Sequence, residues 1–201
     1  MNNIIFIGGS RKITHLKEFA TKRIDNIVTH KFDVIVGDAN GMDKAVQKYL
    51  HSAGHQNVTV FYSGKQPRNN LGNWLAKHIA PPKGAKGYNI HAAKDREMAL
   101  GANYGLMLWD GESLGTLLNI YRLLRVGKKS RLLQFKNESE TVFGNMREWK
   151  SFLDQCNVKI VEGIAKRMRE DTVETTDGVW QDSLFASQER MVGGEMRIAM
   201  R

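Results

Sequence analysis

Short apolar runs alternate along the first half of the chain with segments whose apolar positions recur at helical spacing. Continuous apolar or β-rich runs occupy residues 4–7, 33–36 and 57–62, as expected of strands buried on both faces of a parallel sheet. Helical spacing follows at residues 16–28 and 45–50. The beginning of the chain therefore predicts a βαβαβ unit, which favours a parallel sheet with helices on its faces.

The alternation resumes after residue 94. It predicts a helix over 95–102, strands over 104–109 and 131–135, and a helix between these strands at 117–124. We therefore expect an α/β, Rossmann-like doubly wound fold with a mostly parallel sheet of about five strands. The body of this fold is expected to span residues 1–136.

Residues 137–201 differ in character and are expected to form a partly helical C-terminal extension. A short strand is expected at 158–161 and part of a basic helix at 165–169, whereas 170–201 are polar and weakly periodic. We expect this last stretch to pack on the body or on another subunit, or to be partly disordered. One amphipathic helix, whose face we expect to pack on the body or on a second subunit of a homo-oligomer, carries Met146, Trp149, Phe152, Leu153 and Cys156.

The stretch 63–94 interrupts the alternation. It holds all three prolines of the chain and several lysines and arginines, but no aspartate or glutamate. An acid-free basic loop of this length is often functional, and we expect it to be mobile and to close over an anion. Residues 71–79, which include Trp74, are expected to form a short helix. The alternative is a solvated surface loop without a ligand.

The composition narrows the class of protein. The net charge of +9 favours an anionic partner such as a nucleotide, a phosphate or a nucleic acid. The single cysteine, Cys156, excludes an internal disulfide and a cysteine-based metal cluster, and no metal site is predicted. No apolar run approaches the roughly 20 residues of a membrane helix, and the N-terminus lacks a basic n-region, so we expect a cytoplasmic protein with no membrane partner.

The stretch 109–116 reads as the end of a strand, a Gly-rich turn and the start of a helix. Such a turn leaves backbone N–H groups unpaired at a helix N-terminus, where they and the helix dipole attract phosphate. The hydroxyls of Ser113 and Thr116 can cap the helix or bind the same phosphate. A side chain at Gly115 would obstruct that approach and would strain a backbone with positive φ. A capped turn without a ligand is the alternative.

Two further Gly-rich turns follow the first two predicted strands, at 8–11 and 37–43. Neither has the spacing of the dinucleotide-binding fingerprint GxGxxG, and the chain contains no P-loop. In doubly wound folds, ligands bind outside the carboxyl ends of the strands, where such turns lie. We therefore expect the three turns to meet in one pocket.

Four ordered segments, 7–11, 36–43, 94–98 and 108–116, resemble the SLOG superfamily of Rossmann-like nucleotide-binding proteins, which is related to the Smf/DprA and LOG ("lonely guy") proteins. The similarity is greatest to the YspA-like, cpYpsA-related branch, whose pattern runs roughly GSR, GGARGAD, RNREM and WDGxSxGT. It covers about residues 3–135. The resemblance implies a pocket for a nucleotide or a nucleotide-derived small molecule that the protein senses, sequesters or processes, with no other cofactor.

Roles in this pocket follow from side-chain chemistry. Glycines permit close backbone approach, hydroxyls donate to phosphate or ribose oxygens, cations pair with phosphate, and carboxylates accept from ribose hydroxyls or a base edge. Trp109 either stacks on a base or belongs to the core. The candidate ligand-binding residues are Gly8, Gly9, Ser10, Arg11, Gly37, Asp38, Ala39, Asn40, Gly41, Asp43, Lys94, Arg96, Trp109, Asp110, Gly111, Ser113, Gly115 and Thr116.

Whether the ligand is also processed is left open. LOG proteins hydrolyse the N-glycosidic bond of a nucleotide, with the patterns RKxxM and PGGxGTxEE. The LOG arginine falls on Lys94 and the two glutamates on Leu118 and Asn119, which argues against LOG-type hydrolysis because neither of the latter is a base. The candidate catalytic residues for a different glycosidic chemistry are the remaining carboxylates near the turns, Glu97, Asp110 and Glu112.

Single-stranded nucleic-acid binding, as in the Smf/DprA proteins, is a further alternative. The basic stretch 63–94, Trp74 and the cations Arg167 and Arg169 favour it, because basic grooves with interleaved aromatic residues bind single strands.

Overall fold

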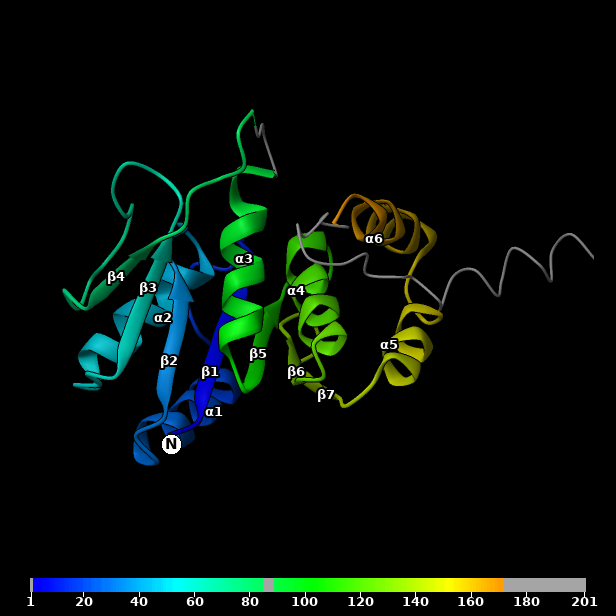
Figure 1. The fold of residues 1–201 in the computed structure, drawn as a ribbon. Helices are drawn as coiled ribbons and strands as arrows, with labels where there is room; N and C mark the ends of the chain where they lie inside the picture. The colour runs from blue at the N-terminus through cyan, green and yellow to red at the C-terminus, as the bar shows by residue number, and fades with distance from the viewer. Residues whose placement is uncertain (1, 85–88, 172–201) are drawn as a thin grey trace, which may run out of the picture. The chain divides into compact units, whose positions relative to one another are not determined.

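The computed structural model describes residues 2–84 and 89–171, which form an α/β fold around one seven-stranded sheet (Figure 1). The strand order is β4-β3-β2-β1-β5-β6-β7, and every neighbouring pair is parallel except β6 with β7. The predicted fold class is confirmed, with seven strands instead of about five. The strands are β1 (Ile4–Gly9), β2 (Asp33–Gly37), β3 (Val58–Tyr62), β4 (Leu75–His78), β5 (Tyr104–Trp109), β6 (Lys129–Gln134) and β7 (Ser139–Phe143).

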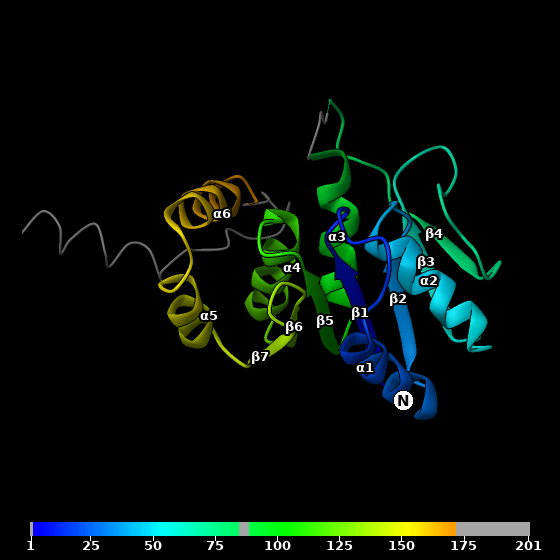
Figure 2. The ribbon, with the colours of Figure 1, turned by 180° about the vertical axis from the view of Figure 1, so that it is seen from behind.

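Helices cover both faces of the sheet, as Figure 2 shows from behind. One core lies between the sheet and the first two helices, and the other between the sheet and the remaining four. Along β1, Ile5 and Ile7 enter the first core while Phe6 enters the second, which explains why the strands are continuously apolar. The helices are α1 (Glu18–Thr29), α2 (Met42–Ser52), α3 (Asn89–Gly101), α4 (Leu114–Arg125), α5 (Met146–Leu153) and α6 (Val158–Glu170).

Helix α4 is the most deeply buried of the helices in the described part of the chain. Every residue from Thr116 to Leu124 is buried, because β1, β5 and β6 lie on its inner side and α3 and α5 flank it. A helix that is enclosed in this way has a fixed position relative to the sheet. Its N-terminus is therefore held firmly beside the carboxyl end of β5.

The segment predicted as a helix at 71–79 is instead a turn followed by β4, which pairs with β3. The side chain of Asn70 bonds both backbone groups of Trp74, and the Trp74 indole N–H donates to the carbonyl of His55 at 3.0 Å. The Trp74 ring folds back over Gly72, where a β-carbon would lie 2.1 Å from Cε2. These contacts require a turn and leave no room for a helix.

Two further differences lie after residue 136. Strand β7, with the sequence SETVF, contains no continuous apolar run, and only Phe143 of its five residues is buried. The sequence pattern therefore did not predict this strand. The strand expected at 158–161 is the first turn of α6, where Ile160 N donates to the side chain of Asn157 at 3.0 Å. The spacing of Ile160, Ile164 and Met168, all buried, is that of a helix face.

The predicted amphipathic helix is α5, although it ends before Cys156. Trp149 is fully buried in the second core, where it stacks on Phe152 and meets Phe143 edge to face. The expectation that this face packs on the body is confirmed, and a homo-oligomer stays a prediction. The described residues up to 168 belong to one compact unit, and residues 172–201 of the expected extension 137–201 lie outside the described part of the chain.

Candidate functional site

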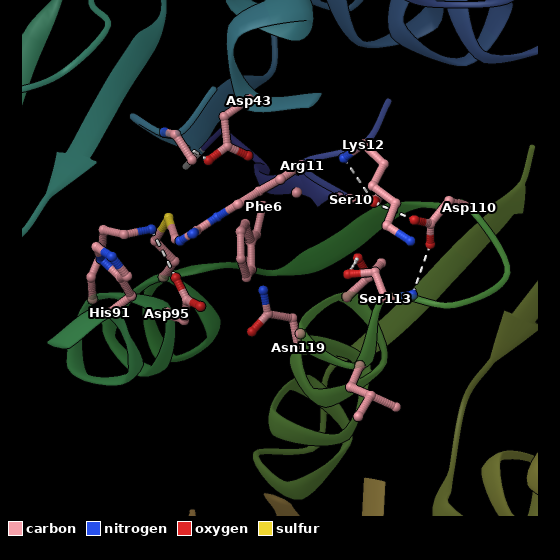
Figure 3. Close-up of a pocket in the computed structure, with 18 of the residues that line it drawn as sticks. Phe6, Ser10, Arg11, Lys12, Asp43, His91, Asp95, Asp110, Ser113 and Asn119 are labelled. Carbon is pink, nitrogen blue, oxygen red and sulfur yellow. Dashed lines mark hydrogen bonds and ion pairs between the residues drawn. The ribbon is translucent and has the colours of Figure 1, made fainter. Parts of the chain in front are cut away.

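A cleft of about 800 Å³ opens at the carboxyl ends of β2, β1 and β5 (Figure 3). Its lining comes from the turns after these strands and from α3, α4 and α6. Figure 3 shows Asp43, His91 and Asp95 toward one side and Lys12, Asp110 and Ser113 toward the other, with Phe6 between them. We call the side with Asp43, His91, Lys94 and Asp95 the β2 end, and the side with Lys12, Asp110, Ser113, Gly115 and Arg167 the α4 end.

Asp110 organises the α4 end. One carboxylate oxygen accepts from the Ser10 hydroxyl at 2.6 Å, and the other accepts from the backbone N–H groups of Glu112 and Ser113 at 3.0 and 2.8 Å. Burial raises the pKa of Asp110, but the hydrogen bonds from Ser10 and the two backbone groups outweigh it and leave the pKa below its ordinary value. Asp110 is therefore an anion that joins the turn after β1 to the turn after β5.

The N-terminus of α4 opens into the cleft. Its N-cap is Ser113, whose side chain makes no capping hydrogen bond to the backbone and accepts from the Thr116 hydroxyl at 3.1 Å. The first N–H groups of a helix have no intrahelical partner. They are therefore available to an anion that enters the cleft.

Gly115 lies within this first turn, so its backbone is helical and needs no positive φ, contrary to expectation. A β-carbon there would meet, among the described atoms within 4 Å, only Nη1 of Arg167, at 3.8 Å. Gly163 of α6 packs closely on Leu114, which holds α6 against the same turn. There is therefore open space beside Gly115, and the guanidinium of Arg167 on α6 borders it.

A chain of buried charges forms the β2 end. The Lys94 ammonium, whose residue is 4% exposed, lies 2.8 Å from Asp95, and Asp95 also pairs with Arg122 at 3.4 Å. Arg122 in turn donates to the side-chain oxygen of Asn119 at 2.7 Å. Burial raises the pKa of Asp95, but the charges of Lys94 and Arg122 hold it below its ordinary value. The acid of this pair is therefore a fixed anion.

Asp43 is held much more loosely. It lies in the first turn of α2 and accepts a hydrogen bond from the backbone N–H of Ala39 at 3.2 Å. Burial, which is the largest effect, raises the pKa of Asp43 to about 6; the charge of Lys94 opposes this and that of Asp95 adds to it. Asp43 is therefore a carboxyl group that changes charge near neutral pH.

Asp38, which was expected to bind the ligand, is paired with Arg68 and does not line the cleft. It receives a bidentate ion pair from Arg68, with nitrogen–oxygen distances of 2.7 and 2.9 Å, and the backbone N–H of Arg68 as well. Burial raises the pKa of Asp38, but the bonds from Arg68 outweigh it and lower the pKa. Asn69 donates to the Asp38 carbonyl at 2.8 Å and Gln47 bonds the same loop. Asp38 thus fixes the start of the basic stretch to the sheet, and Arg68 reaches the cleft from there.

His91 and Arg11 both line the cleft, and in Figure 3 the Arg11 side chain extends toward the β2 end. Burial lowers the pKa of His91, and the charges of Arg11, Arg68 and Lys94 lower it further. The imidazole is therefore neutral at pH 7, in a neighbourhood where cations gather. Its Nδ1 is buried and, among the described residues, has no hydrogen-bond partner.

The structure brings together about three fifths of the residues predicted from the sequence. Those that line the cleft are Gly8, Gly9, Ser10, Arg11, Ala39, Asp43, Lys94, Asp110, Glu112, Ser113, Gly115 and Thr116. Those that do not are Gly37, Asp38, Asn40, Gly41, Arg96, Glu97, Trp109 and Gly111.

The excluded residues have other positions. Gly41 has φ +84° and lies against the Arg11 carbonyl, so it serves the turn itself. Trp109 belongs to the core, where its indole N–H donates to the Ser113 carbonyl at 3.1 Å. Glu97 is exposed on α3. Gly111 and Trp109 border a separate cleft of about 700 Å³ between β7 and α5.

Sequence reasoning missed several residues of the lining: Phe6, Lys12, Arg68, His91, Asp95, Met98, Leu114 and Arg167. Lys12, Asp95 and Leu114 are neighbours of the recognised motifs, and His91 precedes Asp95 by one helical turn. These four residues could have been predicted from the sequence. Arg68 and Arg167 depend on where a loop and a distant helix fold back, which no local pattern shows.

No protein-family model, curated protein or solved structure matches this chain. Among the described residues, no cluster of His, Cys, Asp and Glu has the makings of a metal site. No described helix combines the length and the apolar character that a membrane span needs. The proposal for the function therefore rests on the geometry of the cleft.

Proposed function

We propose that the cleft binds a nucleotide or a nucleotide-derived small molecule, with its phosphate on the N-terminus of α4. The observation that carries this is the uncapped first turn of α4, which faces a cleft of about 800 Å³ with open space beside Gly115. Unpaired N–H groups and the helix dipole favour an anion at such a place. The buried position of α4 keeps these donors preorganised, which lowers the cost of binding.

Cations at the α4 end support a phosphate there. Arg167 borders the opening beside Gly115, and a guanidinium can bond two phosphate oxygens at once. Lys12 pairs with Glu112, but both side chains are more than two-thirds exposed, so solvent weakens this pair and the lysine can turn toward a ligand.

The rest of the cleft suits a sugar and a base. Phe6 and Met98 supply apolar surface in its middle, and Asp43 and Asn119 supply polar atoms beyond it. Strand β1 lies between β2 and β5, so the two ends are separated by two strand spacings, roughly 10 Å. A phosphate at the α4 end would therefore direct the remainder of a nucleotide toward Asp43.

The resemblance of four ordered segments to the SLOG superfamily supports the same ligand class, and it favours sensing or sequestration. Of the two LOG glutamate positions, Leu118 is fully buried in the core and Asn119 presents an amide, so a LOG-type acid is missing from α4. Trp74 is 8% exposed, which removes the aromatic platform proposed for single-stranded nucleic acid.

Calorimetry against nucleoside monophosphates, cyclic nucleotides and ADP-ribose derivatives tests the proposal. We expect Gly115→Val to abolish binding, because its side chain would project into the opening where the phosphate enters. Gly101→Val is the matched control, since a β-carbon at this α3 glycine meets no described atom within 4 Å and lies outside the cleft lining. A ligand that binds Gly115→Val as tightly as the native protein would place the pocket elsewhere.

Salt dependence separates a small ligand from a polyanion. Nucleic acid releases many counterions on binding, so its affinity falls steeply with salt, whereas that of a mononucleotide falls much less. Steep loss of affinity for an oligonucleotide, with no binding of any nucleotide in the panel, would contradict the proposal.

A further inference from the structure

A second cleft, of about 700 Å³, is lined by residues of β7, α5 and the start of α6, at the opposite edge of the sheet from β4 (Figure 1). This volume is typical of a small-molecule site. Its apolar lining includes Val142, Phe152 and Ile160, of which Val142 is 51% exposed and Phe152 is only partly buried. Phe152 packs edge to face on Trp109 and Phe143, with ring centroids 5.8 and 5.3 Å away. A further aromatic ring would extend this cluster.

The charged groups of this lining favour an anion. They are Lys136, Arg147 and Glu148. The Glu148 carboxylate is engaged by the loop before α5, because it accepts from the backbone N–H of Gly144 at 2.6 Å and from the side chain of Asn145 at 2.9 Å. Lys136 and Arg147 are exposed, and within the described chain neither forms an ion pair. The cleft therefore offers two cations to a ligand, whereas its carboxylate is already bonded.

One turn, between β5 and α4, separates this second cleft from the first cleft, at the carboxyl ends of β2, β1 and β5. Trp109 and Gly111 line the second cleft, whereas Asp110, Glu112 and Ser113 line the first. The indole N–H of Trp109 donates to the Ser113 carbonyl at 3.1 Å, so the lining of the second cleft is bonded to the N-cap of α4. A ligand that packs beside Trp109 therefore restrains the turn that forms the α4 end.

We propose that the second cleft binds a small aromatic carboxylate, with its ring beside Phe152 and its carboxylate attracted by Lys136 and Arg147. The ring gains from apolar burial and from edge contacts with the aromatic cluster. A carboxylate matches the planar fork of a guanidinium. Gln134 is a further donor in the lining, since its partly buried amide makes no side-chain hydrogen bond within the described chain. The site is independent of the function proposed above, because the two clefts share no lining residue.

Calorimetry of the full-length protein with indole-3-acetate tests this site, and uncharged indole-3-acetamide is the matched ligand. We expect the carboxylate to bind saturably and the amide to bind about 3- to 10-fold more weakly, because exposed ion pairs contribute modestly. Arg147→Met should weaken binding of the carboxylate about 2- to 5-fold. Lys159→Met, at an exposed α6 cation outside the lining, is its control and should bind like the native protein. Ser151→Glu places a carboxylate at an exposed position of the lining and should weaken binding about 10-fold or more by repulsion.

Hydrogen exchange locates the bound ring. Saturation with indole-3-acetate should slow exchange at residues 109–116 and 147–156, which border the second cleft, and leave residues 18–29 of α1 unchanged. Failure of indole-3-acetate to bind, equal affinity for the acetamide, or native affinity in Ser151→Glu would each overturn the inference. None of these outcomes depends on a nucleotide, so failure at the second cleft leaves the function proposed for the first cleft standing.

Discussion

The two ends of the cleft place charge in different ways. At the α4 end the positive potential comes from backbone N–H groups and from side chains at the rim such as Lys12, which is 71% exposed. At the β2 end it comes from Lys94, which is buried and bonded to Asp95. A buried charge is strongly coupled to its partners, whereas an exposed one is screened by water. Changes at the β2 end should therefore affect folding, and changes at the α4 end should affect binding.

The largest expected effect is that of Lys94→Met. It would leave Asp95 and Asp43 beside Gly37 without their shared cation, and breaking a buried pair from one side costs about 3–5 kcal/mol. Urea denaturation should show this as a lower midpoint with an unchanged slope. The matched control at the other end is Lys12→Met, which should leave the midpoint where it is. Equal urea midpoints for the two variants would contradict the claim that charges at the β2 end stabilise the fold more than charges at the α4 end.

Asp43→Asn should reveal the buried acid through the pH dependence of stability. The pKa of Asp43 is raised in the folded state, from 3.8 to about 6, so the folded protein binds this proton more tightly than the unfolded chain does. The native protein therefore gains stability from this group as the pH falls through 6 toward 4, and loses it as the pH rises.

The Asp43→Asn variant has no ionisable group at position 43, so it lacks this pH-dependent contribution to stability. Its stability relative to the native protein should thus be higher at pH 8 than at pH 4.5, by about 2 kcal/mol from a shift of this size. Denaturation curves of both proteins at the two pH values measure the difference. The carboxyl groups of Asp38, Asp95 and Asp110 have lowered pKa values and act in the opposite sense, but they are common to both proteins and cancel. No difference between the two pH values would show that Asp43 is an ordinary surface acid, and a difference of the reverse sign would show that its pKa is lowered in the folded state.

The anchor between Asp38 and Arg68 lies between these extremes, since the side chain of Asp38 is 2% exposed and that of Arg68 is 41% exposed. Arg68→Met would leave a buried carboxylate without its charged donor, at a cost of about 1.5–3 kcal/mol, reduced by the water that reaches the pair. We expect hydrogen exchange to accelerate at residues 68–74 in this variant. In the native protein this segment should be protected even without a ligand, so closure over an anion is expected only in the later part of the basic stretch.

Much of the fold was predictable because its central strands are buried on both faces. The runs in β1, β2 and β5 are continuously apolar, and no other element type fits them at that length. The edge strands β4 and β7 were not predicted, because their side chains are mostly not buried. In β4 no side chain is buried and in β7 only Phe143 is, so their pairing with β3 and β6 supplies what the sequence pattern lacks.

The candidate site divides in the same way. Most of the α4 end, apart from Lys12 and Arg167, comes from the turn 109–116, so the sequence pattern predicted it. The β2 end depends on partners from separate elements: Asp43 lies in the first turn of α2, while Lys94 and Asp95 belong to α3. Asp43 was selected as a ligand residue and Lys94 as a phosphate partner. Their neighbouring position over Gly37, with Asp95 completing the set, follows only from the packing of α3 against the sheet.

The smallest expected effect tests the α4 end without disturbing the fold. Thr116→Ala removes a hydroxyl that donates to Ser113 at 3.1 Å, so the Ser113 hydroxyl loses the bond that orients it at the helix N-terminus. Affinity for a nucleotide should fall by about 0.5–1.5 kcal/mol, the net value of one hydrogen bond. Thr116→Ser keeps the hydroxyl and should bind like the native protein, which separates the lost bond from the lost methyl group. Because Thr116 is 2% exposed, the urea midpoint must be measured alongside. If Thr116→Ala lowers the midpoint but leaves calorimetric affinity unchanged, the hydroxyl pair is only part of the helix cap, and the phosphate position must rest on the backbone N–H groups alone.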